Sequence, residues 1–514
     1  MKFLVLLLSD FNEFSSQKLF PSASGGLKSA FERSSEWARA LEYEDAQKEV
    51  SVLECKGWNC GRLMQSVADR AKKSGADFVV LASGSAAFLD LPLSKKLIQD
   101  HVEYKAEYTF ADGYPAGFAP EIIDSGAAAI MAELCKGASA VEAQKSLSKD
   151  SVFNVIKGDI NSFEVETEIA SVDYRLLRLN FLCDSKINLL SAAGLAQKLS
   201  AGAKQALLEL DRQKIGEENV MEICKEAACE PCVLKSVPAF YNVQIEGRSF
   251  AKYEFSPLGA SDERMDFERF KALVKKITDF SGQAVISLSL FGEAAAHPDF
   301  DKFVALALKS GHSVFVEVDS GFLQEFLQGA AYGNLRQGLL PEEKERLFMA
   351  VCVDAATQGA YEKFHDGDLQ NAAAAIRSLA QEFPEVYPQF TRVVENESEL
   401  EAFYRYWSAK DSPSGGKIII QKYDSFCGLL PDKKTADLSP LVREPCWRLR
   451  RDFEILLDGS FLLCRESFRQ ALGNAFDSDF SELWKKKDLV LAEQAKKEFT
   501  GACANCDEWY TFNF

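Results

Sequence analysis

The sequence lacks several features that would assign it to a common functional class. No apolar run reaches the ~20 residues that a transmembrane helix needs. Basic residues are outnumbered, with 59 Lys and Arg against 77 Asp and Glu and a net charge of −18, so phosphates are repelled over most of the surface. We therefore expect neither a nucleic-acid nor a membrane partner. A protein or small-molecule partner stays unidentified.

We also expect no secretory signal peptide at the start of the sequence. The apolar run at residues 3–8 is short, meets Asp10, and is followed by no small-residue cleavage pattern, so it predicts a buried first β-strand. The thirteen cysteines are odd in number and concentrated toward one end. This distribution favours thiolate ligands in a reducing cytoplasm over a disulfide framework.

Four cysteines near the C-terminus form the strongest motif. Cys446 and Cys464 follow the pattern C-x12-G-x4-C, and Cys503 and Cys506 form C-x2-C. Four thiolates suit a tetrahedral zinc site or a [4Fe–4S] cluster, while buried cysteines without a ligand are the alternative. Asp458-Gly459 predicts a hairpin turn that returns Cys464 toward Cys446.

This segment resembles the SPASM/twitch auxiliary-cluster domain that follows radical S-adenosylmethionine (radical SAM) enzymes. The resemblance rests on the cysteine spacing, on Gly473-Asn474 and on Trp484. Because only four ligand candidates are present, the resemblance implies one auxiliary [4Fe–4S] cluster, as in the shorter twitch form.

The length of 514 residues predicts about three domains. Strand-like runs at 2–8, 50–53 and 78–81 alternate with helical stretches at 26–41 and 61–74, which predicts a doubly wound α/β sheet over residues 1–205. Residues 206–235 are predicted to be a helical linker. Further strand and helix repeats predict a partial (β/α) barrel at 236–430, followed by the cysteine domain at 431–514.

The first domain resembles sugar-activating nucleotidyltransferases of the glycosyltransferase-A type in residues 80–90, 101–121 and 159–166. The family places a metal-binding aspartate after the second strand. Here that position corresponds to Gly84 or Ser85, which leaves Asp90 alone. The loop after the first strand also lacks the glycines and lysine of a phosphate cradle. A retained scaffold is expected, with nucleotidyl transfer at Asp90 and Asp112 as the alternative.

The middle domain resembles radical SAM enzymes at residues 288–300. The resemblance implies that Gly292 and Glu293 bind the methionyl amino group of S-adenosylmethionine. The family's C-x3-C-x2-C cluster loop, however, aligns with Ser249, Tyr253 and Ser256, which do not hold a cluster.

Three nearby cysteines, Cys224, Cys229 and Cys232, precede the strand instead of following it. They are helix-end cysteines without a ligand, a zinc or iron–sulfur site, or a displaced radical SAM site. His297 and His365 stand alone in sequence and are interpreted as local hydrogen-bonding residues.

The order of the three segments resembles the spiro-SPASM proteins of spirochaetes. The leading hypothesis is an iron–sulfur protein with an inactive radical SAM-like core that binds a partner or transfers electrons in a modification pathway. An active radical SAM enzyme acting on a peptide or small molecule and a sugar nucleotidyltransferase are the alternatives. The sequence assigns no catalytic residues, and it does not decide whether the protein is an enzyme.

Overall fold

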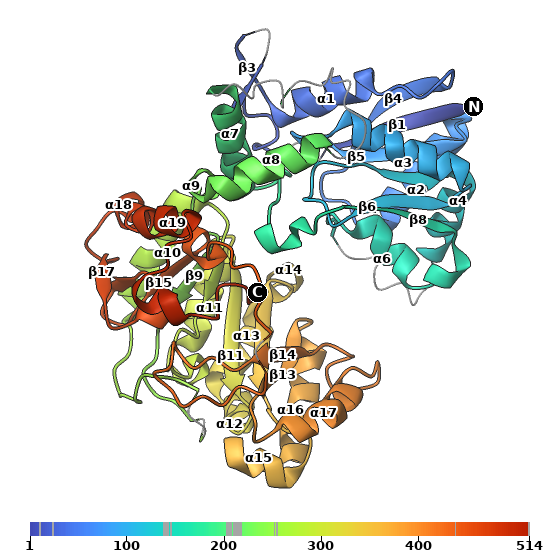
Figure 1. Cartoon of the computed structure of the whole chain (residues 1–514). Helices are drawn as coiled ribbons and strands as arrows, with labels where there is room; N and C mark the ends of the chain where they lie inside the picture. Colours follow the sequence, from blue (N-terminus) through green and yellow to red (C-terminus); the bar gives the residue numbers. More distant parts are fainter. Residues whose placement is uncertain are drawn as a thin grey trace. The chain divides into compact units, whose positions relative to one another are not determined.

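The computed structural model describes residues 1–9, 12–22, 25–136, 146–201, 218–250, 255–436 and 438–511, together with Ala143, Leu208 and Lys252. Two compact units divide the chain at 236/237, Met1–Ser236 and Val237–Phe514. Each contains a sheet covered by helices (Figure 1), so the predicted α/β class is confirmed. The boundaries predicted at 205 and 430 do not separate compact units. None of the helices in the described ranges is long and apolar enough to cross a membrane.

The first unit is built on a mixed six-stranded sheet in the order β4-β1-β5-β7-β6-β8. Its inner strand β1 is almost continuously apolar, because helices cover both faces of the sheet. The strands are β1 (Lys2–Ser9), β4 (Gln47–Glu54), β5 (Phe78–Ser83), β6 (Tyr108–Asp112), β7 (Glu121–Asp124) and β8 (Val165–Ile169). The main helices are α1 (Ala30–Ala40), α2 (Cys60–Ser74), α3 (Leu91–Glu103), α4 (Ser125–Leu134), α6 (Ser151–Lys157) and α7 (Lys186–Ala201).

The described part of the predicted linker belongs to this unit. It forms α8 (Glu218–Cys229) and α9 (Pro231–Leu234). Val220, Ile223 and Leu234 pack into one of the unit's apolar cores. Burial of these side chains makes the helices part of the domain.

The second unit carries a nine-stranded sheet in the order β14-β13-β12-β11-β10-β9-β15-β16-β17. Strands β9 to β14 are parallel neighbours in chain order, as the predicted partial barrel requires. They are β9 (Phe240–Val243), β10 (Val285–Ser287), β11 (Ser313–Asp319), β12 (Leu347–Cys352), β13 (Val386–Arg392) and β14 (Ile419–Lys422).

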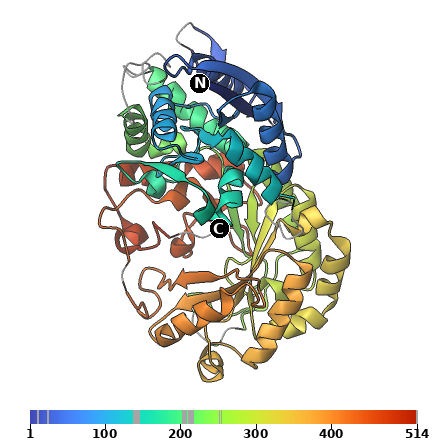
Figure 2. The same cartoon turned by 90° about the vertical axis from the view of Figure 1, so that its right-hand side faces the viewer.

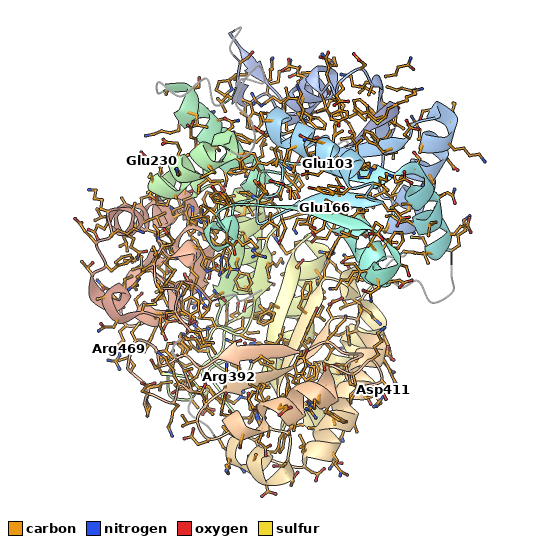
Figure 3. All side chains as sticks on the ribbon, turned by 45° about the vertical axis from the view of Figure 1, so that its right-hand side comes forward. Glu103, Glu166, Glu230, Arg392, Asp411 and Arg469 are labelled. Atoms are coloured by element: carbon orange, nitrogen blue, oxygen red, sulfur yellow. The ribbon has the colours of Figure 1, made fainter. Side chains whose placement is uncertain are left out.

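Helices lie along one side of this sheet (Figure 2) and bury the largest apolar core of the unit. They are α10 (Phe267–Ser281), α11 (Phe300–Lys309), α12 (Leu323–Gln328), α13 (Ala330–Gly338), α14 (Pro341–Lys344), α15 (Gln358–Phe364), α16 (Leu369–Glu382) and α17 (Leu400–Trp407). Arg392, labelled in Figure 3, ends β13 and pairs with Glu397 at 2.5 Å.

The cysteine segment continues the barrel sheet. Strand β15 (Asp452–Ile455) pairs in parallel with β9, and β16 (Ser460–Leu462) and β17 (Ala471–Asn474) follow as antiparallel neighbours. The predicted hairpin at Asp458-Gly459 is therefore confirmed. Gly459 has φ +84°, and a Cβ there would lie 2.3 Å from the ring of Phe476, so the turn needs glycine. Helices α18 (Phe480–Lys485) and α19 (Asp488–Ala495) cover the hairpin.

A buried histidine links the carboxyl ends of two barrel strands. Nδ1 of His365 lies 2.7 Å from Asp319 at the end of β11, and Nε2 lies 3.0 Å from Asp354 after β12. Although burial lowers the pKa of His365, its two carboxylate partners outweigh it and raise the pKa to about 9. The imidazolium therefore holds two acidic side chains together at the strand ends.

We predict that this link makes stability depend on pH. Because the pKa of folded His365 lies above its ordinary value of 6.5, the stabilisation is complete below pH 6.5 and is lost as the pH rises through 9. The free energy of unfolding of the wild type relative to His365→Gln, measured by urea titration, should fall by about 3 kcal/mol over this range. A difference that stays constant with pH would contradict the link. His297→Gln is the control, because burial lowers the pKa of His297.

Candidate metal centre

The four C-terminal cysteines line one cavity, although they come from three separate segments. Cys446 precedes the turn Trp447–Arg450, Cys464 follows β16, and Cys503 and Cys506 flank the end of the turn Gly501–Asn505. The remaining lining residues are Arg443, Arg448, Leu449, Arg465, Glu466, Gln494, Glu508 and Trp509. The four sulfurs predicted as a ligand set therefore converge. Their binding of a metal stays a prediction.

Burial controls the protonation of these thiols. It raises the pKa of Cys446 to about 12, and it also raises the pKa values of Cys464 and Cys503. The neighbouring sulfur of Cys506 adds to each of these shifts through charge repulsion. Thiolates bind metals, so loading this cavity must release protons into solution.

The cavity fits an iron–sulfur cluster in its polar chemistry. Arg443 Nε, a buried donor in its lining, has no hydrogen-bond partner among the described residues. The lining contains three arginines and two glutamates, so its charged side chains have an excess of positive charge. Iron–sulfur clusters with four thiolate ligands carry net negative charge, which such cations neutralise. Within the described residues, no group of three or more His, Cys, Asp or Glu side chains is arranged to hold a single metal ion.

Hydrogen-bonding groups surround the sulfurs. The backbone N–H of Glu508 donates to Cys506 Sγ at 3.4 Å, and Ser467 Oγ lies 3.7 Å from Cys464 Sγ. Cys446 is positioned through its backbone N–H, which donates to Gln494 Oε1 at 2.8 Å. Donors of this kind tune the reduction potential of a cluster by stabilising charge on sulfur.

A fifth cysteine lies beside the loop that carries Cys503. Cys427 follows β14, and its thiol donates to the carbonyl of Ala502 at 3.3 Å. The neighbouring Cys506 raises the pKa of Cys427, and Cys427 lowers the pKa of Cys506. Sequence spacing did not reveal Cys427, because it stands alone 19 residues before Cys446.

A second cavity lies inside the barrel and shares two residues with the first. Arg448 and Arg465 line both cavities. The barrel strands contribute mostly polar side chains, which are Asn242, Ser287, Ser289, Glu317, Gln389 and Gln421. Phe240, Phe315, Ile419, Arg451 and Asp452 complete the lining. An interior face of amides, hydroxyls and ions is suited to a polar ligand.

Gly292 and Glu293, the residues predicted to bind S-adenosylmethionine, contact other parts of the protein. Glu293 is 6% exposed, and its carboxylate accepts the N–H groups of Asp319 at 2.8 Å and Ala295 at 3.3 Å. Burial raises the pKa of Glu293 to about 8. A Cβ on Gly292 would lie 2.0 Å from the carbonyl oxygen of Glu246, so the glycine allows two loops to pass closely. Cofactor binding by Gly292 and Glu293 stays a prediction.

The loop after β9 does not fit a three-cysteine cluster. Residues 247–264 contain no cysteine. The hydroxyl of Ser256 bonds locally with the backbone of Leu258, Ser249 is exposed, and Tyr253 lies outside the described residues. This loop is held instead by the buried Glu246, which pairs with Arg248 at 3.2 Å and Arg264 at 3.0 Å.

The three cysteines of the segment predicted as a linker have different surroundings. Cys224 is fully buried in an apolar core, Cys229 is exposed, and Cys232 is half-buried. His297 makes one local contact, accepting the N–H of Asp299, and one distant contact, to the carbonyl of Met265. His365 is also a hydrogen-bonding residue, but its two partners were not evident from the sequence.

In the first unit, the candidate residues Asp90 and Asp112 form contacts within the protein. Asp90 caps α3 by accepting the N–H of Leu93 at 2.8 Å and also accepts a bond from Asn219. Asp112 lies 3.8 Å from Arg175. At Gly84, a Cβ would lie 2.8 Å from the carbonyl of Leu8 and 2.9 Å from the ring of Phe31. These packed neighbours do not fit a metal and triphosphate beside Gly84.

Two solved structures share low similarity with the chain. Streptococcus suis SuiB bound to precursor peptide SuiA has 12% identity and a TM-score of 0.42, covering 66% of this chain and 88% of that one. A cytidylyltransferase from Leptospira borgpetersenii has 11% identity and a TM-score of 0.30, covering 45% of this chain and 95% of that one.

Sequence comparisons are more informative. Residues 446–507 match the model of SPASM, an iron–sulfur cluster-binding domain. An uncharacterized protein of Treponema pallidum (strain Nichols) is 34% identical over 380 residues, which cover 71% of this chain and 98% of that protein. The chain therefore belongs to the family of this Treponema protein, and its residues 446–507 form a SPASM iron–sulfur cluster-binding domain.

Proposed function

We propose that this protein holds one auxiliary [4Fe–4S] cluster and acts in ligand binding or electron transfer within a modification pathway, with a radical SAM-like core that does not cleave S-adenosylmethionine. One observation carries the proposal. The cavity lined by the four cysteines shares Arg448 and Arg465 with the polar cavity of the barrel. A redox centre and a ligand site would therefore have common neighbours.

The residues around the cysteines have distinct roles in this proposal. Cys446, Cys464, Cys503 and Cys506 hold the cluster, which supplies one-electron redox chemistry when bound. Arg448 is buried and pairs with Glu508 at 3.2 Å, and Arg465 pairs with Asp424 at 2.5 Å. Because both guanidiniums are fixed by carboxylates, their positive charge stays oriented toward the two cavities.

The barrel cavity supports a polar small molecule as the partner. Glu317 lies in this cavity with Arg465 and Gln389. Burial has the largest effect on the pKa of Glu317 and raises it, while Arg465 and Gln389 lower it. The hydroxyl of Ser289 accepts the N–H of Glu317 at 2.8 Å. Amide and hydroxyl groups on the strands can hydrogen-bond a ligand, while the arginines favour an anionic group on it. The thiol-rich site favours a reducing cytoplasm as its location.

The proposed absence of S-adenosylmethionine cleavage rests on the loop after β9. That chemistry needs three cysteine ligands and an iron left open for the cofactor. The loop has hydroxyl side chains at Ser249 and Ser256, and the nearby Glu293 is engaged with backbone N–H groups. The alternative of a displaced cluster would need Cys224 to leave an apolar core.

We predict that Cys503→Ala abolishes cluster binding, because one of the four proposed iron ligands is removed. The measurement is iron and sulfide content with absorption spectra after anaerobic purification. The wild type should contain about four iron atoms per chain, as one [4Fe–4S] cluster requires, and the variant nearly none. Full iron content in Cys503→Ala would contradict the ligand assignment.

Replacing both Cys229 and Cys232 by Ala is the matched control and should leave the iron content unchanged. Loss of iron in this control would instead favour the alternative that these cysteines, together with Cys224, hold a cluster.

We also predict that the reduced, cluster-loaded protein does not cleave S-adenosylmethionine. Incubation with dithionite and the cofactor, followed by chromatography, should yield no 5′-deoxyadenosine above a protein-free control. Electron paramagnetic resonance on the same sample establishes that the cluster has been reduced. Formation of 5′-deoxyadenosine that follows protein concentration would overturn the inactive-core proposal and leave the C-terminal ligand assignment intact.

A further inference from the structure

We propose that strand β4 of the first unit pairs with β4 of a second copy of this chain, so that the two sheets continue into one another in antiparallel fashion. Within the described strands β4 pairs with β1 alone, which makes it an edge of its sheet. It is eight residues long and keeps one register throughout. The opposite edge β8 has five residues, and the edges β14 and β17 of the second unit have four each. A long, regular edge is a template for further pairing.

This edge also exposes apolar side chains. The strand reads Gln-Lys-Glu-Val-Ser-Val-Leu-Glu and contains neither proline nor glycine. Val50 and Val52 are 38% and 37% exposed. The register places them beside Val5 and Leu7 of β1, which are buried in the core that α1 covers. The apolar layer on this face of the sheet therefore ends at two exposed valines, which a further strand would cover.

The pairing with β1 determines which backbone groups lie on the open side of β4. The N–H of Gln47 donates to the carbonyl of Met1 at 3.0 Å, and the N–H of Cys55 donates to that of Ser9 at 2.8 Å. Because the direction of these groups alternates along a strand, the odd-numbered residues between them also face β1. The N–H and C=O groups of residues 48, 50, 52 and 54 therefore point away from β1.

A twofold axis through Ser51 uses all of these outward groups. It sets Val50 opposite Val52 of the second copy and Lys48 opposite Glu54 of the second copy. Both members of each pair direct their N–H and C=O groups outward, as the hydrogen-bonded pairs of an antiparallel ladder require. An axis between two residues would instead set an outward residue opposite an inward one, and the ladder could not form.

The same register matches the side chains. Val50 and Val52 of the two copies cover one another, and Lys48 of each copy meets the carboxylate of Glu54 from the other. Pairs of β-branched residues and pairs of opposite charge both stabilise neighbouring strands. The ammonium group of Lys48 already donates to the carbonyls of Arg39 and Leu41, so Glu54 would add a charged partner to these neutral ones. The edge is complementary to itself, which identifies a second copy as its partner.

The test is the mass of the full-length protein, measured by sedimentation velocity over a range of concentrations. The wild type should form a dimer of twice the chain mass of 57.0 kDa. Val52→Pro should weaken dimerisation by at least about tenfold, because proline removes an outward N–H that β1 does not use and places its ring in the interface. A wild type that stays monomeric at every concentration would overturn the inference, as would a Val52→Pro dimer of unchanged strength.

Thr167→Pro on the opposite edge is the matched control. The N–H of Ala170 donates to the carbonyl of Asp112 at 2.9 Å, so by the same alternation the N–H of Thr167 in β8 points away from β6. This variant should dimerise like the wild type. Equal weakening by Thr167→Pro and Val52→Pro would contradict pairing through β4.

Two charge variants provide a second test that does not use proline. Lys48→Glu and Glu54→Lys should each dimerise several-fold more weakly than the wild type, because like charges then oppose each other across the axis. A mixture of the two variants should recover the wild-type affinity, since every introduced charge meets its opposite. A folding defect in one variant is not corrected by adding the other, so recovery identifies direct contact. Failure of the mixture to form dimers would overturn the inference.

Discussion

The parallel pairing of β15 with β9 is the constraint on which the second unit depends. Its register runs from Asp452 beside Phe240 to Ile455 beside Val243. The rings of Tyr241 and Phe453 lie 5.3 Å apart across this pair, and Phe480 of α18 packs on Phe453 at 4.8 Å. Because the cysteine hairpin is joined to the first barrel strand, the residues flanking its cysteines also line the barrel interior. The shared arginines follow directly from this register.

Two buried cations in this unit are paired with carboxylates from segments far apart in the sequence. Lys487 is fully buried and donates to Glu454 at 2.8 Å and to the carbonyl of Asp452 at 2.6 Å. An unpaired ammonium at that depth would be very costly. His365 is likewise buried and forms ion pairs with Asp319 and Asp354 at the strand ends. One ion pair holds helix α19 against β15, and the other closes the carboxyl ends of β11 and β12.

Several parts of the site could be predicted because local sequence carries them. Asp458-Gly459 specifies a tight hairpin, since glycine alone accepts its positive φ and crowded surroundings. The four motif cysteines are separated by recognisable spacings. Cys427 could not be found in this way, because its contact with Ala502 depends on the position of β14 relative to the C-terminal turn. Arg448 and Arg465 resemble ordinary surface cations in the sequence, and only the strand register directs them toward two cavities.

The sequence by itself determined the α/β class, the order of most strands and helices, and the cysteine motif of the SPASM domain. These features depend on short-range periodicity, turn residues and ligand spacing, which a linear chain displays directly. Tertiary structure decided which side chains meet: Glu293 with the end of β11, Asp90 with Asn219, His365 with two aspartates, and the four motif cysteines with one another. Such contacts depend on strand pairing and on burial. Residues that are distant in the chain become neighbours only when the strands pair and the apolar side chains are buried.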